Sequence, residues 1–172
     1  MSGYSILWSP WRAQYVKNAG KGSDKSCFIC EAIKKHKDPE SLVVYVNDSI
    51  VVLLNKYPYN SGHIMIAPLR HIKNLEDLTE KEWAEITKAF VNFKKALEKV
   101  FSPDGFNIGA NLGRAAGAGL EDHLHFHIVP RWAGDANFMF TIGHTKVIPQ
   151  SLDETLKELK KVIVELSESS KN

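Results

Sequence analysis

The sequence predicts an α+β fold in which a mostly antiparallel, five-stranded sheet packs against one long helix and a C-terminal helix. Three features of the chain predict it. Short runs of β-branched residues occupy positions 42–67, an amphipathic helical pattern follows over 79–100, and histidines alternate with apolar residues over 123–128. A period of two indicates a strand, whereas a spacing of three to four residues indicates a helix.

Three strands are expected first, as an antiparallel meander. Leu42–Val46 and Ile50–Leu54 are apolar runs joined by Asn47–Ser49, a segment typical of a hairpin turn. His63–Ala67 follows a second turn and is closed by Pro68. These runs predict the first half of the sheet.

The long helix is expected to begin at Thr79, because Glu82 follows it with capping-box spacing. Its apolar stripe consists of Trp83, Ile86, Phe90, Phe93, Leu97 and Val100. Phe106–Asn111 is the expected fourth strand and the histidine segment the fifth. Ser151 and Glu154 repeat the capping-box spacing ahead of the C-terminal helix. The expected order is β-β-β-α-β-β-α.

Length and charge restrict the type of protein. The 172 residues suffice for one domain, and we expect a single domain over 1–172, with an aromatic arm over 1–25 and a C-terminal helix and tail over 151–172. A net charge of +2 gives no reason to expect nucleic acid as a partner. No apolar run approaches the roughly 20 residues of a membrane span, and the start lacks a signal-peptide pattern. We therefore expect a cytoplasmic protein with no membrane partner.

His123, His125 and His127 recur at every second position, so an extended segment places them on one side and the apolar residues between them on the other. A single histidine on a strand is usually a structural residue. Three adjacent imidazoles are costly to bury without partners, because they repel one another when protonated. The row therefore favours a metal site or a catalytic site that handles an anion.

Cys27 and Cys30 are the only cysteines and form a Cys-x-x-Cys pair. Such a pair is compatible with a redox couple, with half of a zinc site, or with two reduced thiols that bind no metal. The strand that precedes a thioredoxin-type motif is missing here, because a loop leads into Cys27. A tetrahedral zinc site needs two further ligands, which imidazoles can supply.

A glycine-rich loop, Gly113–Gly119, leads into the histidine row. Glycine lets backbone N–H groups approach an anion closely. Alone, such a loop is more often a plain turn. Beside three imidazoles, it makes Gly117 and Gly119 candidate phosphate-binding positions.

These segments resemble the histidine triad family of nucleotide hydrolases and transferases, whose signature alternates three histidines with apolar residues. The resemblance covers about residues 42–135. It is carried by His123–Arg131, Asn111–Gly113, Leu54–Pro58, Ser61–Ile64 and Ala67–Arg70. The segments before residue 71 look like the fragile-histidine-triad branch, whereas Trp132–Asn137 and Lys146–Gln150 are similar to microbial diadenosine tetraphosphate phosphorylases.

The resemblance implies a covalent mechanism. His125 would attack the α-phosphorus of a nucleotide and form a nucleotidyl-imidazole intermediate, which water or phosphate then resolves. His127 would hydrogen-bond a phosphate oxygen or help to protonate the leaving group. Asn55 would contact the nucleotide sugar and Asn111 the bridging phosphate, although asparagines at these positions also suit ordinary turns. His63 would support the nucleophile from beside it.

A related family implies the metal ligands. In galactose-1-phosphate uridylyltransferases, a Cys-x-x-Cys pair, a further histidine and the first histidine of the active-site motif hold zinc. The matching residues are Cys27, Cys30, His71 and His123. The resemblance thus implies a structural zinc that fixes the His123 ring, and with it the end of the catalytic strand. It also implies a homodimer.

The expected function is hydrolysis at the α-phosphate of a diadenosine polyphosphate or a related adenosine nucleotide. In the transferase branches the third histidine is often glutamine, so His127 favours hydrolysis. One alternative is a diadenosine tetraphosphate phosphorylase or nucleotidyltransferase, with phosphate as the acceptor. Another is a zinc-stabilised nucleotide-binding module without turnover. Ala118–Asp122 departs from the family pattern, which has Gln and Ser or Thr before the triad, so the leaving-group preference stays open.

Overall fold

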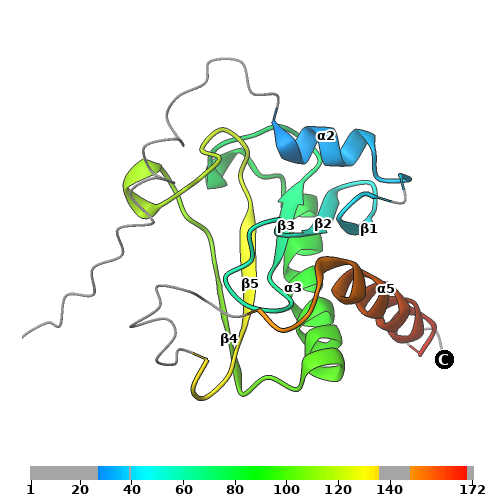
Figure 1. Ribbon diagram of the computed structural model, residues 1–172. Helices are drawn as coiled ribbons and strands as arrows, with labels where there is room; N and C mark the ends of the chain where they lie inside the picture. The colour runs from blue at the N-terminus through cyan, green and yellow to red at the C-terminus, as the bar shows by residue number, and fades with distance from the viewer. Residues whose placement is uncertain (1–26, 39, 136–147, 170–172) are drawn as a thin grey trace, which may run out of the picture. The chain divides into compact units, whose positions relative to one another are not determined.

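Five strands form one antiparallel sheet in the order β1-β2-β3-β5-β4 (Figure 1). The computed structural model describes residues 27–38, 40–135 and 148–169. Its elements are α2 (Phe28–Lys34), β1 (Val43–Val46), β2 (Ile50–Leu54), β3 (Ile64–Pro68), α3 (Glu80–Phe101), β4 (Gly105–Gly109), β5 (Phe126–Arg131) and α5 (Leu152–Ser169), with single 3-10 turns at Leu75–Asp77 and Arg114–Ala116. The predicted fold class and the β1–β3 meander are confirmed. The aromatic arm lies outside the described residues.

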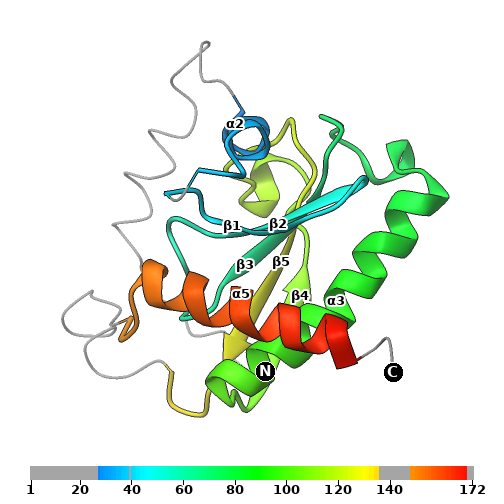
Figure 2. The same ribbon diagram turned by 90° about the vertical axis from the view of Figure 1, so that its right-hand side faces the viewer.

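The two faces of the sheet carry different cores. α3 and α5 cover one face, as Figure 2 shows, and pack on alternate residues of β2, β3 and β5. Phe126 and Ile128 belong to this core, as their alternation with histidine predicted. The opposite face carries a smaller apolar cluster of Ile29, Val43, Val51, Leu53, Met65 and Ala67. Because β5 contributes no residue to that cluster, its second face is available for polar side chains.

Both predicted capping boxes are present. The Thr79 hydroxyl accepts from the Glu82 N–H at 3.2 Å, and the Glu82 carboxylate accepts from the Thr79 N–H at 2.9 Å. Ser151 and Glu154 make the same reciprocal pair at the start of α5. None of the described helices is both long enough and apolar enough to cross a membrane.

β5 is shorter than the alternation predicted. It begins at Phe126 rather than His123, because the N–H of Leu124 donates to the carbonyl of Ile72 instead of a neighbouring strand. Alternation describes side-chain directions, which an extended segment outside a sheet shares. β4 likewise ends at Gly109, opposite His127, and not at Asn111. His127 therefore lies within the sheet, whereas His123 and His125 precede it.

Candidate active site

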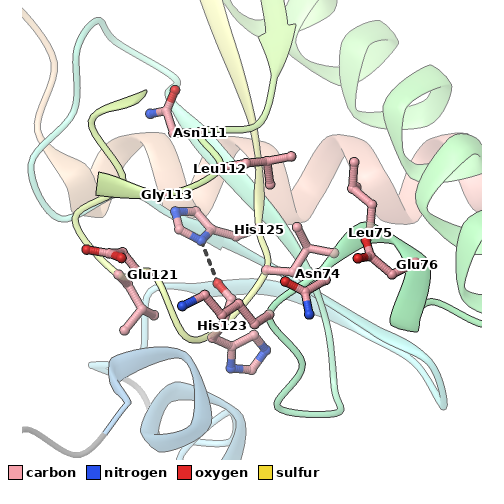
Figure 3. A pocket seen from close by; sticks show the side chains of 12 residues that line it. Asn74, Leu75, Glu76, Asn111, Leu112, Gly113, Glu121, His123 and His125 are labelled. Atoms are coloured by element: carbon pink, nitrogen blue, oxygen red, sulfur yellow. Dashed lines mark hydrogen bonds between the residues drawn. The ribbon is translucent and has the colours of Figure 1, made fainter. Parts of the chain in front are cut away.

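His125 is a buried side chain with a defined hydrogen bond. The residue is 7% exposed, and its Nδ1 lies 2.8 Å from the carbonyl oxygen of His123 (Figure 3). A carbonyl oxygen can only accept, so Nδ1 carries the ring proton and Nε2 keeps its lone pair. Nε2 is thus the atom of this ring that is able to attack an electrophile.

Burial keeps the site histidines neutral. It lowers the pKa of His125, and the hydrogen bond to the His123 carbonyl opposes this shift only in part. Burial, together with His125, lowers the pKa of His127 to about 4. Burial, together with His127 and His125, lowers the pKa of His63 to about 3. Near neutral pH the His125 ring is therefore unprotonated at Nε2 and competent as a nucleophile.

His127 and His63 form a pair beside His125. The His125 and His127 ring centroids are 4.9 Å apart in an edge-on arrangement. His63 Nε2 lies 3.0 Å from His127 Nδ1, and His63 is 1% exposed. His127 stands opposite Met65 on β3 and Gly109 on β4, so the glycine leaves space next to the imidazole. The structure thus brings together the three histidines that the sequence associated with phosphate chemistry.

Four potential metal ligands converge at the other end of the same segment. His123 Nδ1 lies 3.2 Å from Cys27 Sγ and 3.5 Å from Cys30 Sγ, and His71 Nδ1 lies 3.3 Å from Cys30 Sγ. All four ligand atoms lie within 4.8 Å of one another. The predicted ligands therefore lie together, although they come from the N-cap and first turn of α2, the segment after β3 and the segment before β5.

The chemistry of this cluster suits a soft divalent cation. His123 Nε2 donates to the carbonyl oxygen of Pro68 at 2.9 Å, which leaves Nδ1 unprotonated and able to coordinate. Two sulfurs with two imidazole nitrogens are a common tetrahedral zinc donor set. Burial and the neighbouring Cys27 raise the pKa of the Cys30 thiol, an effect that a bound cation reverses. The residues present fit zinc.

An open pocket reaches His125 and His123 (Figure 3). Its lining consists of Lys73, Asn74, Leu75, Glu76, Asn111, Leu112, Gly113, Leu120, Glu121, His123, Leu124 and His125. Asn111 and Gly113 therefore share a pocket with the nucleophile candidate. The other predicted nucleotide-binding and phosphate-binding positions do not line it: Asn55, His63, Gly117, Gly119 and His127.

Asn55 and the glycine loop have local structural roles. Asn55 Oδ1 accepts from the N–H of Tyr57 at 2.9 Å, which is an Asx turn after β2. Gly113 and Gly117 have φ values of 78° and 89°, so both positions favour glycine for conformational reasons. Between them, Arg114 pairs with Glu121 at 3.0 Å across the loop. Phosphate binding by Gly117 and Gly119 stays a prediction.

Sequence reasoning missed the pocket wall made by Lys73–Glu76. These residues follow His71 within five positions, so they lie near His123 once His71 and His123 share a metal site. The polar composition of the segment was the available signal, but it is also typical of a solvent-exposed turn. Asn74 and Asp77 do form such a turn, with Asp77 accepting from the Asn74 side chain at 3.1 Å.

Known proteins are similar to this chain in sequence. Residues 36–134 match the HIT domain. The AP-4-A phosphorylase of Mycobacterium tuberculosis is 43% identical over 158 residues, which cover 89% of this chain and 81% of that protein. The asymmetrical bis(5'-nucleosyl)-tetraphosphatase of Schizosaccharomyces pombe is 34% identical over 95 residues, which cover 55% of this chain and 52% of that protein.

Solved structures of histidine triad proteins have a similar fold. A Zn-bound histidine triad family protein from Mycobacterium smegmatis matches with a TM-score of 0.67 and 23% identity, over 84% of this chain and 97% of that one. A hypothetical histidine triad nucleotide-binding protein from Sulfolobus tokodaii matches with a TM-score of 0.67 and 27% identity, over 82% and 94%. With the domain match over more than half of its length, the chain belongs to the histidine triad (HIT) family of nucleotide hydrolases and transferases and is a HIT-type enzyme.

Proposed function

We propose that this enzyme is a diadenosine tetraphosphate phosphorylase that transfers an adenylyl group to inorganic phosphate through His125. The observation that carries the proposal is the unprotonated Nε2 of a buried His125 beside a pocket that contains Asn111. The 43% identity to AP-4-A phosphorylase favours phosphate over water as the acceptor. Phosphorolysis therefore replaces the hydrolysis that the third histidine suggested.

The reaction proceeds in two displacements at the same phosphorus. His125 Nε2 attacks the α-phosphorus, the bond from that phosphorus to its bridging oxygen breaks, and ATP leaves with the bonding electrons. The imidazole gains positive charge as the N–P bond forms. The carbonyl oxygen of His123, 2.8 Å from Nδ1, stabilises this charge by accepting a strengthened hydrogen bond. An oxygen of inorganic phosphate then attacks, the N–P bond breaks, and ADP is released.

The remaining side chains position the substrate. Asn111 and Gly113 line the pocket next to His125 and are placed to contact the phosphates. His127 hydrogen-bonds a phosphate oxygen, Asn55 contacts the ribose, and the glycines of the loop offer backbone N–H groups. These assignments are inferred from the family resemblance. The specificity for adenosine is inferred from the same resemblance.

We also assign a structural zinc ion to Cys27, Cys30, His71 and His123. The donor set and its spacing support this assignment, as does the zinc named for the Mycobacterium smegmatis protein of the same fold. When bound, zinc supplies a rigid connection between the start of α2 and the segment that enters β5. No step of the reaction proceeds through it.

Product analysis tests the acceptor. The full chain is incubated with diadenosine tetraphosphate, with and without 18O-labelled inorganic phosphate, and the nucleotides are separated and weighed by mass spectrometry. Phosphorolysis yields ATP and ADP, requires phosphate and places the label in the β-phosphate of ADP. Formation of AMP and ATP at the same rate without phosphate would establish hydrolysis instead.

Trapping of the intermediate tests the nucleophile. Brief mixing with substrate in the absence of phosphate should leave an acid-labile adenylyl adduct on His125, and H125A should form neither adduct nor products. H36Q is the matched control, because the His36 ring bonds the carbonyl of Ile33 away from the pocket. Tight AMP binding without any adduct in the unsubstituted protein would favour a non-catalytic binding module.

A further inference from the structure

We infer that His63 is a positioning residue that holds the neutral His127 ring in the tautomer with its proton on Nε2, so that His127 donates a hydrogen bond to the phosphate without transferring a proton. This inference rests on the proposed function. It assigns different roles to two adjacent imidazoles. It follows from consecutive hydrogen bonds in which the donor and the acceptor can be identified.

The chain starts at a backbone donor. The N–H of Tyr59 lies 3.1 Å from His63 Nδ1. A backbone amide nitrogen can only donate, so Nδ1 of His63 accepts and carries no proton. The neutral His63 ring therefore carries its proton on Nε2. Its burial, at 1% exposure, disfavours the doubly protonated form.

The second hydrogen bond fixes the tautomer of His127. His63 Nε2 lies 3.0 Å from His127 Nδ1. Since His63 donates from Nε2, His127 accepts at Nδ1 and its own proton resides on Nε2. The low pKa values of both rings, about 3 for His63 and about 4 for His127, agree with two neutral imidazoles joined in this direction.

The turn between β2 and β3 holds this arrangement in place. The Tyr59 ring stacks on the His63 ring with centroids 4.7 Å apart. The buried Asn60 side chain donates to the carbonyl of Pro130 at 3.0 Å and to Asp135 at 2.8 Å. The Asn60 carbonyl accepts from the N–H of His63 at 3.2 Å. The donor to His63 is thus attached to the end of β5, the strand that carries His127.

Two neighbouring imidazoles are consequently in opposite tautomers. His125 has its proton on Nδ1, where it donates to the His123 carbonyl, and offers a lone pair at Nε2. His127 has its lone pair on Nδ1 and offers Nε2–H. A neutral imidazole that lost its only proton would become an unstable imidazolate anion, so His127 acts by hydrogen bonding to developing negative charge. The leaving nucleotide departs as its anion.

Ring-nitrogen spectroscopy tests the chain without any turnover. The full chain is labelled with 15N-histidine, and long-range 1H–15N correlations are recorded near neutral pH. The H36Q variant assigns the signals of the His36 ring and serves as a control that should leave the other rings unchanged. We expect His63 and His127 to show an unprotonated Nδ1 and a protonated Nε2, and His125 to show the reverse. A proton on Nδ1 of His127 would overturn the inference and leave the nucleophilic role of His125 intact.

Substitution of His63 tests the consequence for catalysis. H63M removes the donor and should lower kcat by roughly tenfold or more with KM changed little, since a lost transition-state donor acts on kcat. It should also leave the His127 ring exchanging between tautomers. H63Q supplies an amide donor and should restore most of kcat and the single tautomer. Equal losses in both variants, or an unchanged His127 spectrum in H63M, would refute the role. If H63M fails to fold, the spectrum of the unsubstituted chain still decides.

Discussion

The Nδ1–H of His125 donates to the carbonyl oxygen of His123 at 2.8 Å, while the ring of the same His123 lies 3.2 Å from the sulfur of Cys27. His123 therefore contacts the predicted metal ligands with its side chain and the proposed nucleophile with its backbone. A change in how the His123 ring is held changes where its carbonyl lies. We therefore expect the predicted metal ligands and His125 to be coupled through His123.

Loss of the metal should weaken both stability and catalysis. C30S removes one thiolate ligand, so we expect the zinc content to fall, the Tm to drop and kcat to decrease, because the carbonyl that orients His125 loses its support. Metal analysis, thermal unfolding and turnover of diadenosine tetraphosphate measure the three effects. H36Q, which leaves the cluster unaltered, should behave like the parent protein. Full activity of zinc-free protein would contradict the coupling.

Gly62 is required by both backbone conformation and space. Its φ is 74°, and an added Cβ would lie 2.8 Å from Cε2 of Phe101 and 3.0 Å from Cδ2 of Leu97. G62A should therefore lower the free energy of unfolding by about 2–4 kcal/mol, from the unfavourable φ and the overpacking together. Urea unfolding measures it. G105A, where a Cβ meets nothing within 4 Å, should cost much less, and equal losses would contradict this explanation.

Glu82 should make part of the stability depend on pH. Arg70 holds its carboxylate through two hydrogen bonds of 2.8 and 2.7 Å, and this pairing lowers the pKa of Glu82 from 4.5 to about 2. Between these values the unfolded chain binds more protons than the folded one, so stability from Glu82 is complete above pH 4.5 and is lost as pH falls through 2.

E82Q measures that contribution. At neutral pH the substitution should cost roughly 1–3 kcal/mol, because a neutral amide cannot replace a carboxylate paired with a guanidinium. The difference from the parent should shrink as the pH approaches 2. Urea unfolding at several pH values gives the comparison. A difference that stays constant over this range would show that charge on Glu82 is not the source.

The family resemblance predicts a homodimer. β4 is an edge strand of the sheet. Its Ile108 is 45% exposed, and the nearby Leu112 is 49% exposed. Unpaired edges with apolar side chains favour association. Sedimentation equilibrium should therefore give twice the chain mass of 19.3 kDa, and I108K should shift the equilibrium towards the monomer. A monomeric parent protein at all accessible concentrations would exclude the prediction.

Local signals in the sequence predicted much of the fold. The capping boxes at Thr79 and Ser151 depend on residues three positions apart, and the burial of Phe126 and Ile128 follows from alternation. The strand ends at Phe126 and Gly109 were not predictable in this way, because a strand ends where its hydrogen bonds to the neighbouring strand end, and the neighbour is distant in the sequence. The resemblance assigns Asn55 to the nucleotide sugar, which stays a prediction, and the structure adds that its Oδ1 accepts from the N–H of Tyr57 in a turn.

By itself, the sequence determined which residues are candidates for the chemistry: the histidine row and the cysteine pair are recognisable from residue type and spacing, and the family resemblance added His71. Only the tertiary structure decided which nitrogen of each ring holds the proton. The tautomer of an imidazole is set by its hydrogen-bond partners. For His123 that partner is the carbonyl of Pro68, 55 residues away in the chain, and for His127 it is His63, 64 residues away. Folding brings these groups together, and it thereby decides which nitrogen of each ring is able to donate a hydrogen bond and which keeps a lone pair.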